Sequence, residues 1–169
     1  MNVEINKILY ASDLGDQSLQ AFKFAVLEGR KHDAEITFLN VIEPPSHATE
    51  AIFKNFAEND ELVILRKNGI QNIRNLMDTR IEEFYAKEFS AKEISSLKKP
   101  TSRIEEGHPA ETIIWVAKEI GADLIVMGSR HSKRNTIEKF FLGSTALNLM
   151  QISTIPVLVV PFSKDIADD

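Results

Sequence analysis

Short apolar runs alternate with longer amphipathic stretches along this chain. Four of the runs are strongly apolar and one is more polar; they span 8–11, 36–42, 102–106, 124–127 and 157–160. Runs this short, bounded by glycine, proline or charged residues, are typical of strands in a sheet that is covered on both faces. Because the run at 102–106 is the least apolar, we expect it to form an edge strand.

Helical periodicity fills the intervals between the runs and predicts helices over about 18–31, 61–89, 110–120 and 143–151. Pro109 suits the start of the third helix and Gly121 suits the left-handed residue that ends it. Gly69 is a weak point in the second helix, since glycine costs a helix interior about 1 kcal/mol relative to alanine. The expected buried stripes are Leu19, Phe22, Ala25 and Val26 on the first helix and Leu62, Leu65, Ile73, Met77, Ile81 and Phe84 on the second.

The alternation of five strands with helices predicts an α/β fold with a five-stranded parallel sheet and helices on both faces. The chain has 169 residues, 43% hydrophobic and 27% charged, which fits one globular domain. We expect its core to span about 5–162, followed by a short polar tail at 163–169. The segment 46–60 has no firm pattern.

Composition and charge exclude several classes of partner. The net charge of −5 argues against general binding of nucleic acid or of a membrane surface, because both require excess lysine and arginine. No segment approaches the roughly 20 apolar residues of a membrane span, and the N-terminus lacks the pattern of a secretory signal. We therefore expect a soluble cytoplasmic protein.

The chain shows no pattern of a metal centre or of a common hydrolase. It has no cysteine, and its four histidines are scattered, so we expect no metal site. The motifs GxxxxGK[ST], HExxH and GxSxG do not occur. We expect no catalytic residues and no enzyme activity, although slow ATP hydrolysis stays open.

Two glycine turns joined by a basic loop form a candidate phosphate cradle. Gly128 ends the fourth strand, and Gly143, Ser144 and Thr145 open the last helix. N–H groups at a helix start have no intrahelical acceptor and lie at the positive end of the peptide dipoles, so they suit an anion. The basic residues of the loop are Arg130, His131, Lys133, Arg134 and Lys139, against the single acid Glu138. We expect one of Arg130, Lys133 and Arg134 to contact a phosphate, and His131 to be a further candidate.

The other half of the candidate site follows from the rule that ligands of open α/β sheets bind beyond the carboxyl ends of the strands, where the winding reverses. Asp13 follows the first strand and suits a base or a ribose, and the backbone near Val41 suits the base edge. Ala11 and Met127 complete the expected contacts. Two alternatives stay open: in one, Asp13 only holds its turn or caps the first helix; in the other, the glycines are only structural turns.

Four segments together resemble the universal stress protein family over almost the whole chain. They read KILYASD, AEITFLNVIEP, EEGHPAETIIWVAKEIGADLIVMGSRH, and FFLGSTALNL followed by IPVLVVP. The resemblance implies a Rossmann-like sheet of the adenine nucleotide alpha hydrolase type. It also implies a homodimer, paired here through Val157–Val160.

Some members of this family bind ATP through the pattern Gly-x2-Gly-x9-Gly-(Ser/Thr), and this chain matches it in part. Gly128 fits the first glycine and Gly143 with Ser144 fits the last pair, but His131 stands at the second glycine. The interval from Gly128 to Gly143 holds 14 residues, two more than the pattern. The resemblance implies a stress-response dimer that binds ATP, with or without Mg²⁺. The alternative is a dimeric interaction module without nucleotide, whose site was lost through these two changes.

Overall fold

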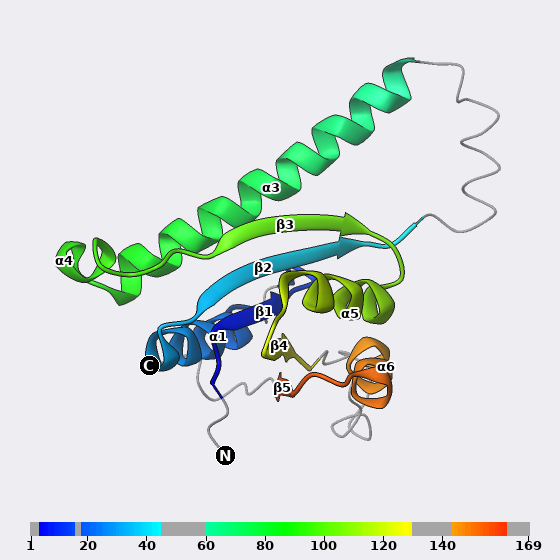
Figure 1. The fold of residues 1–169 in the computed structure, drawn as a ribbon. Helices are drawn as coiled ribbons and strands as arrows, with labels where there is room; N and C mark the ends of the chain where they lie inside the picture. The colour runs from blue at the N-terminus through cyan, green and yellow to red at the C-terminus, as the bar shows by residue number, and fades with distance from the viewer. Residues whose placement is uncertain (1–3, 16–17, 45–59, 130–142, 162–169) are drawn as a thin grey trace, which may run out of the picture.

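The computed structural model describes residues 4–15, 18–44, 60–129 and 143–161 of the chain (Figure 1). Their elements, in chain order, are β1 (Lys7–Ala11), α1 (Ser18–His32), β2 (Glu35–Ile42), α3 (Asp60–Glu88), α4 (Ala91–Ile94), β3 (Thr101–Glu106), α5 (Pro109–Ile120), β4 (Leu124–Gly128), α6 (Ser144–Ile152) and β5 (Val157–Val160). The nine elements predicted from the sequence are all present, each with boundaries within one residue of the prediction.

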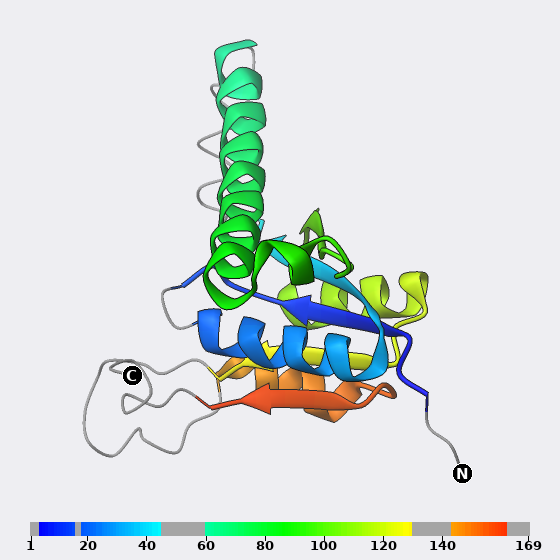
Figure 2. The ribbon, with the colours of Figure 1, turned by 90° about the vertical axis from the view of Figure 1, so that its left-hand side faces the viewer.

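The five strands form one parallel sheet in the order β3-β2-β1-β4-β5. The predicted fold class is therefore confirmed, and β3 is the edge strand that its polarity indicated. Helices α1 and α3 cover one face of the sheet, and α5 and α6 cover the other (Figure 2). This arrangement buries both faces of the central strands, which explains why they are apolar along their whole length.

Each face of the sheet carries its own hydrophobic cluster. On the α1 and α3 face, Tyr10 lies between Phe22 and Phe38, with ring centroids 5.3 and 4.8 Å away, and Phe84 of α3 packs 4.8 Å from Phe22. Burial raises the pKa of Tyr10 to about 12. The opposite cluster is aliphatic; its fully buried members are Leu9, Leu39, Val116, Ala117, Ile125 and Leu149.

Helix α5 begins and ends at the residues that the sequence predicted. Pro109 occupies its first turn and Gly121 ends it in the left-handed conformation, at φ 67°. His108 stands at the N-cap position, but its imidazole makes no capping hydrogen bond. Helix α1 lacks a glycine at its end, and Asp33 adopts the left-handed conformation there instead, at φ 52°.

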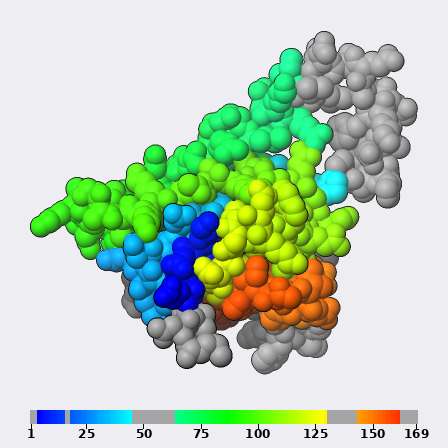
Figure 3. Space-filling model, in the orientation of Figure 1, coloured from blue at the N-terminus to red at the C-terminus, as the bar shows by residue number. Residues whose placement is uncertain are grey.

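Two residues of the predicted buried stripes are exposed, so that part of the prediction is wrong. Leu19 at the start of α1 is 52% exposed and Leu65 in the first half of α3 is 64% exposed. The periodicity was correct for the helix but not for its burial, because the first half of α3 leans away from the sheet (Figure 1) and projects from the body of the molecule (Figure 3). The later stripe residues Met77, Ile81 and Phe84 lie over the sheet and are buried as expected. The Leu62 side chain and most of the segment 46–60 lie outside the described residues.

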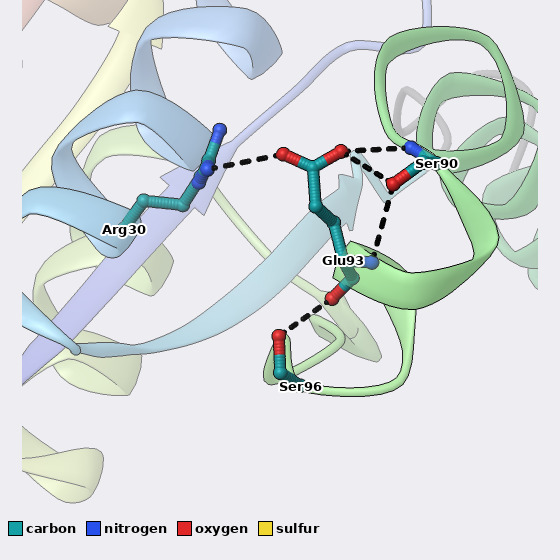
Figure 4. A network of polar contacts seen from close by, with 4 residues as sticks. All are labelled: Arg30, Ser90, Glu93 and Ser96. Carbon is teal, nitrogen blue, oxygen red and sulfur yellow. Dashed lines mark hydrogen bonds and ion pairs between the residues drawn. The ribbon is translucent and has the colours of Figure 1, made fainter.

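The short helix α4 was not predicted, although its sequence contains a helix-start signal. Ser90 and Glu93 form a capping box, in which the Ser90 N–H donates to Glu93 Oε2 at 2.9 Å and the Glu93 N–H donates to Ser90 Oγ at 3.4 Å (Figure 4). The backbone N–H of Ser90 lowers the pKa of the Glu93 carboxyl. Glu93 Oε1 also lies 3.7 Å from the Arg30 guanidinium, which ties α4 to α1.

Candidate functional site

The sheet changes its winding direction between β1 and β4. The chain leaves β1 to build β2 and β3 on one side, then returns to add β4 and β5 on the other. Ala11 pairs with Met127 in the sheet, so Ser12, which follows β1, and Gly128, which ends β4, lie at the same carboxyl edge of the switch point. Open α/β sheets bind their ligands at this position.

The predicted site residues that the structure describes lie on the elements around this switch point. Ala11 and Met127 are buried at the ends of β1 and β4, and Val41 lies half-buried near the end of β2. Asp13 is exposed in the loop that follows β1. Gly128 is half-buried, and the N–H of the next residue, Ser129, donates to the Val160 carbonyl at 2.9 Å.

The loop after β1 is held in place by its own side chains. The Gly15 N–H donates to Asp13 Oδ1 at 2.9 Å, and the Leu14 N–H donates to Ser12 Oγ at 3.0 Å. Leu14 adopts the left-handed conformation, at φ 61°, which is unfavourable for a residue with a side chain. The interpretation that Asp13 holds its own turn is therefore confirmed, whereas its contact with a ligand stays a prediction.

Side chains from other elements hold the two ends of the same loop. Asn40 of β2 donates from Nδ2 to the Ser12 carbonyl at 2.9 Å. At the start of α1, the Tyr10 hydroxyl donates to the Ser18 carbonyl at 2.7 Å and Arg80 of α3 donates to Ser18 Oγ at 3.2 Å. Sequence reasoning missed all three of these residues, and the one usable signal was Asn40, a polar residue inside the apolar run 36–42.

Gly128 is a position where the fold does not require glycine. Its φ lies outside the left-handed region that favours glycine. A Cβ atom built on it would lie 3.7 Å from the Ala21 Cβ and 4.0 Å from the Val160 carbonyl oxygen, which are ordinary contacts. The packing around the end of β4 therefore tolerates a side chain and does not explain why this residue is glycine.

The first turn of α6 returns to the same edge of the sheet. Strands β4 and β5 are parallel neighbours, so the helix that connects them runs in the opposite direction and begins at the carboxyl edge. Gly143 is its N-cap residue, followed by the exposed Ser144 and the half-buried Thr145. The first N–H groups of a helix have no intrahelical acceptor, so this turn supplies donors for an anion. Arg130, His131 and the rest of the basic loop lie outside the described residues, and their roles stay predictions.

Comparison with known proteins decides the family. A sequence model of the universal stress protein family matches residues 4–161. The chain belongs to the universal stress protein family. The resemblance drawn from the four sequence segments is thereby confirmed.

Similar universal stress proteins are known from bacteria and archaea. The universal stress protein YxiE of Bacillus subtilis is 32% identical over 157 residues, which cover 92% of this chain and 98% of that protein. The universal stress protein MJ0577 of Methanocaldococcus jannaschii is 30% identical over 168 residues, covering 95% and 97%. The solved structure of MJ0577 superimposes with a TM-score of 0.67 at 28% identity, covering 95% of this chain and 98% of that one.

A further solved universal stress protein was crystallised in complex with cAMP. It shares the fold, with a TM-score of 0.60 at 20% identity, and the match covers 95% of this chain and 99% of that one. In the part of this chain that the structure describes, no helix has the length and apolar character needed to cross a bilayer. Within the same ranges, no three acidic, histidine or cysteine side chains lie together as a possible metal site.

Proposed function

We propose that this chain is a cytoplasmic stress-response protein that binds an adenine nucleotide, with ATP the first candidate, and that it does so as a homodimer. The observation that carries the proposal is Gly128. Its bare backbone lies at the switch point of the sheet, and nothing in the surrounding packing requires glycine there. A glycine that the fold does not need suits close approach of a phosphate.

The described residues fit the two halves of a nucleotide. Gly128, Gly143, Ser144 and Thr145 supply backbone and hydroxyl donors of the kind that hold phosphates. On the other side of the switch point, the ordered turn at Asp13 presents a carboxylate suited to ribose hydroxyls or a base amino group. The cAMP complex of a universal stress protein with the same fold supports an adenine nucleotide as the ligand class.

Binding, rather than catalysis, is the activity that we propose. Phosphoryl transfer to water needs a group that positions the water and takes its proton. The chemistry expected of the site is recognition: the nucleotide would order the loops at the carboxyl edge and change the shape of the dimer or its choice of partner.

The homodimer is proposed to form through β5. This strand is the outermost one on its side of the sheet, and Val157, Leu158 and Val159 are only half-buried. Exposed apolar residues continue the surface on the neighbouring helix α6; they are Leu147, Met150 and Ile152, at 40%, 46% and 48% exposure. An apolar strand edge beside an apolar helix surface favours a second copy as the partner. Light scattering tests this directly, and a monomer at high micromolar concentration would contradict it.

The competing function is a dimeric interaction module that binds no nucleotide. His131 at the second glycine of the motif and the two additional loop residues favour it. The two functions differ in one cheap observation. The purified protein is denatured by heat and its supernatant assayed for adenine nucleotide, and ATP with Mg²⁺ is then titrated by calorimetry. Absence of nucleotide together with no binding up to millimolar ATP would sink the nucleotide proposal.

The cradle itself is tested by Gly143→Val. The backbone at Gly143, with φ −56° and ψ 152°, is accessible to any residue, so valine need not disturb the fold. Its branched side chain should block phosphate approach and weaken ATP binding. Gly69→Val is the matched control. Gly69 lies on α3, outside the proposed cradle, and a Cβ there meets nothing within 4 Å. If Gly143→Val stays folded and binds ATP as well as the control does, the phosphates are held elsewhere.

A further inference from the structure

Asn40 stands out because of where it is buried. It is 6% exposed, and among the described residues it is the one buried side chain that is polar or charged. Phe38, two residues earlier on the same face of β2, packs in the aromatic cluster. Burying an amide in apolar surroundings is unfavourable unless its polar atoms find partners. The structure gives Asn40 one such partner, and that partner lies in the loop of the proposed site.

The partner of Asn40 is the Ser12 carbonyl, 2.9 Å from Asn40 Nδ2. The N–H of Ser12 donates to the carbonyl of Leu39, also at 2.9 Å. Two successive residues of β2 therefore hold both backbone groups of Ser12. The Leu39 bond continues the ladder of the sheet, whereas the Asn40 bond acts after β1 has ended, on the peptide that links Ser12 to Asp13.

The orientation of that peptide controls the rest of the turn. Ser12 Oγ accepts the Leu14 N–H, and Asp13 Oδ1 accepts the Gly15 N–H. Leu14 is left-handed, a conformation that a residue with a side chain keeps only when its surroundings hold it. The Asn40 amide lies outside the loop and donates a hydrogen bond to the Ser12 carbonyl, where this turn starts. Removing the amide should therefore release the Asp13 carboxylate from its present position.

We propose that Asn40 is a positioning residue for the nucleoside half of the ligand site. It acts through the Ser12 carbonyl to set the Asp13 carboxylate, and it does not itself contact the ligand. This inference rests on the proposed function, since it assigns a role within the same adenine-nucleotide site. It predicts that the affinity contributed by Asp13 depends on an amide on the neighbouring strand.

The first test is Asn40→Leu, which removes the amide donor and keeps a side chain of similar volume. Binding of ATP and of AMP is measured by calorimetry well below the unfolding temperature. We expect both affinities to fall by the same factor, about tenfold, because loss of one positioning hydrogen bond disturbs the nucleoside half and leaves the phosphate half intact. If Asn40→Leu does not fold, Asn40→Thr replaces it, since threonine suits a strand and is too short to reach the Ser12 carbonyl.

Two further variants separate positioning from general stability. Ile36→Val removes one buried methylene from the same strand, at the end far from the turn, so it should lower the unfolding temperature and leave the ATP affinity unchanged. Asp13→Ala removes the carboxylate that Asn40 is proposed to set. In that background Asn40→Leu should have little further effect on affinity, because the group through which it acts is already gone.

The possible results separate this inference from the proposed function. If the parent chain binds no adenine nucleotide, both fall together. If the parent binds ATP and Asn40→Leu binds it equally well, the role of Asn40 alone is wrong. Equal losses of affinity in Asn40→Leu and Ile36→Val, or fully additive losses in the double variant with Asp13→Ala, also overturn it. Loss of affinity that disappears in the Asp13→Ala background supports it.

Discussion

Replacing Gly128 by alanine should separate the stability of this protein from its nucleotide binding. The new Cβ would lie 3.7 Å from the Ala21 Cβ and 4.0 Å from the Val160 oxygen, so it fits without displacing either. Because the backbone there is not left-handed, alanine can adopt it, and the unfolded chain loses conformational freedom. We expect the free energy of unfolding to stay the same or to rise by about 0.4–1 kcal/mol.

The effect on ligand affinity should have the opposite sign. We expect a methyl group there to hinder the close approach of a phosphate to the backbone at the end of β4. A hydrogen bond to a charged group contributes about 1.5–3 kcal/mol, so loss of one should weaken ATP binding roughly 10- to 150-fold. Calorimetric titration of ATP gives the affinity, and thermal unfolding without ligand gives the stability of the same preparation.

Gly121→Ala is the matched control for this prediction. A Cβ at Gly121 meets nothing within 4 Å, but its φ of 67° is left-handed, so alanine there should cost about 1–2 kcal/mol. Gly121 ends α5, before β4 begins and away from the carboxyl edge of the sheet. We expect this control to lose stability and keep its affinity for ATP. The reasoning is refuted if Gly128→Ala binds ATP as tightly as the parent, or if it is the less stable of the two variants.

Three further predictions concern stability. Burial raises the pKa of Tyr10 from 10 to about 12, so Tyr10 ionises first in the unfolded chain, and its ionisation should lower stability by about 2–3 kcal/mol between pH 10 and 12. Burial also raises the pKa of Tyr85 to about 12 and adds to the fall, so urea denaturation of Tyr10→Phe should show a smaller fall rather than none. Asp123 Oδ2 accepts two backbone N–H groups at the start of β1, at 2.8 and 3.0 Å, so Asp123→Ala should cost about 1–2 kcal/mol; an unchanged urea midpoint would contradict this role. Ser90→Ala should cost about 1 kcal/mol of stability, because it removes the side-chain cap of α4. It should raise the lowered pKa of Glu93 only in part, since the backbone N–H of residue 90 remains. A full return to the ordinary carboxyl pKa, measured by NMR, would show that the hydroxyl dominates.

The candidate site was only partly visible in the sequence. Gly128 and Asp13 were predicted because strand ends and glycine turns have local signatures, and the structure places Gly128 at the end of β4 and Asp13 in the loop after β1. The side chains that hold the loop after β1 in place were not predicted. Asn40 lies 28 positions from Ser12, and Arg80 lies 62 positions from Ser18, so no local pattern announces either contact.

Local sequence patterns specify the five strands and the four longer helices of this protein, because periodicity, proline and glycine act within a few residues of chain. Pro109 and Gly121 bound α5 as their chemistry requires. Only the tertiary structure decided which apolar faces are covered and which distant residues meet. Leu65 and Met77 belong to one helical stripe, yet the first is exposed and the second fully buried. Burial depends on what lies opposite, and the first half of α3 rises away from the sheet (Figure 1).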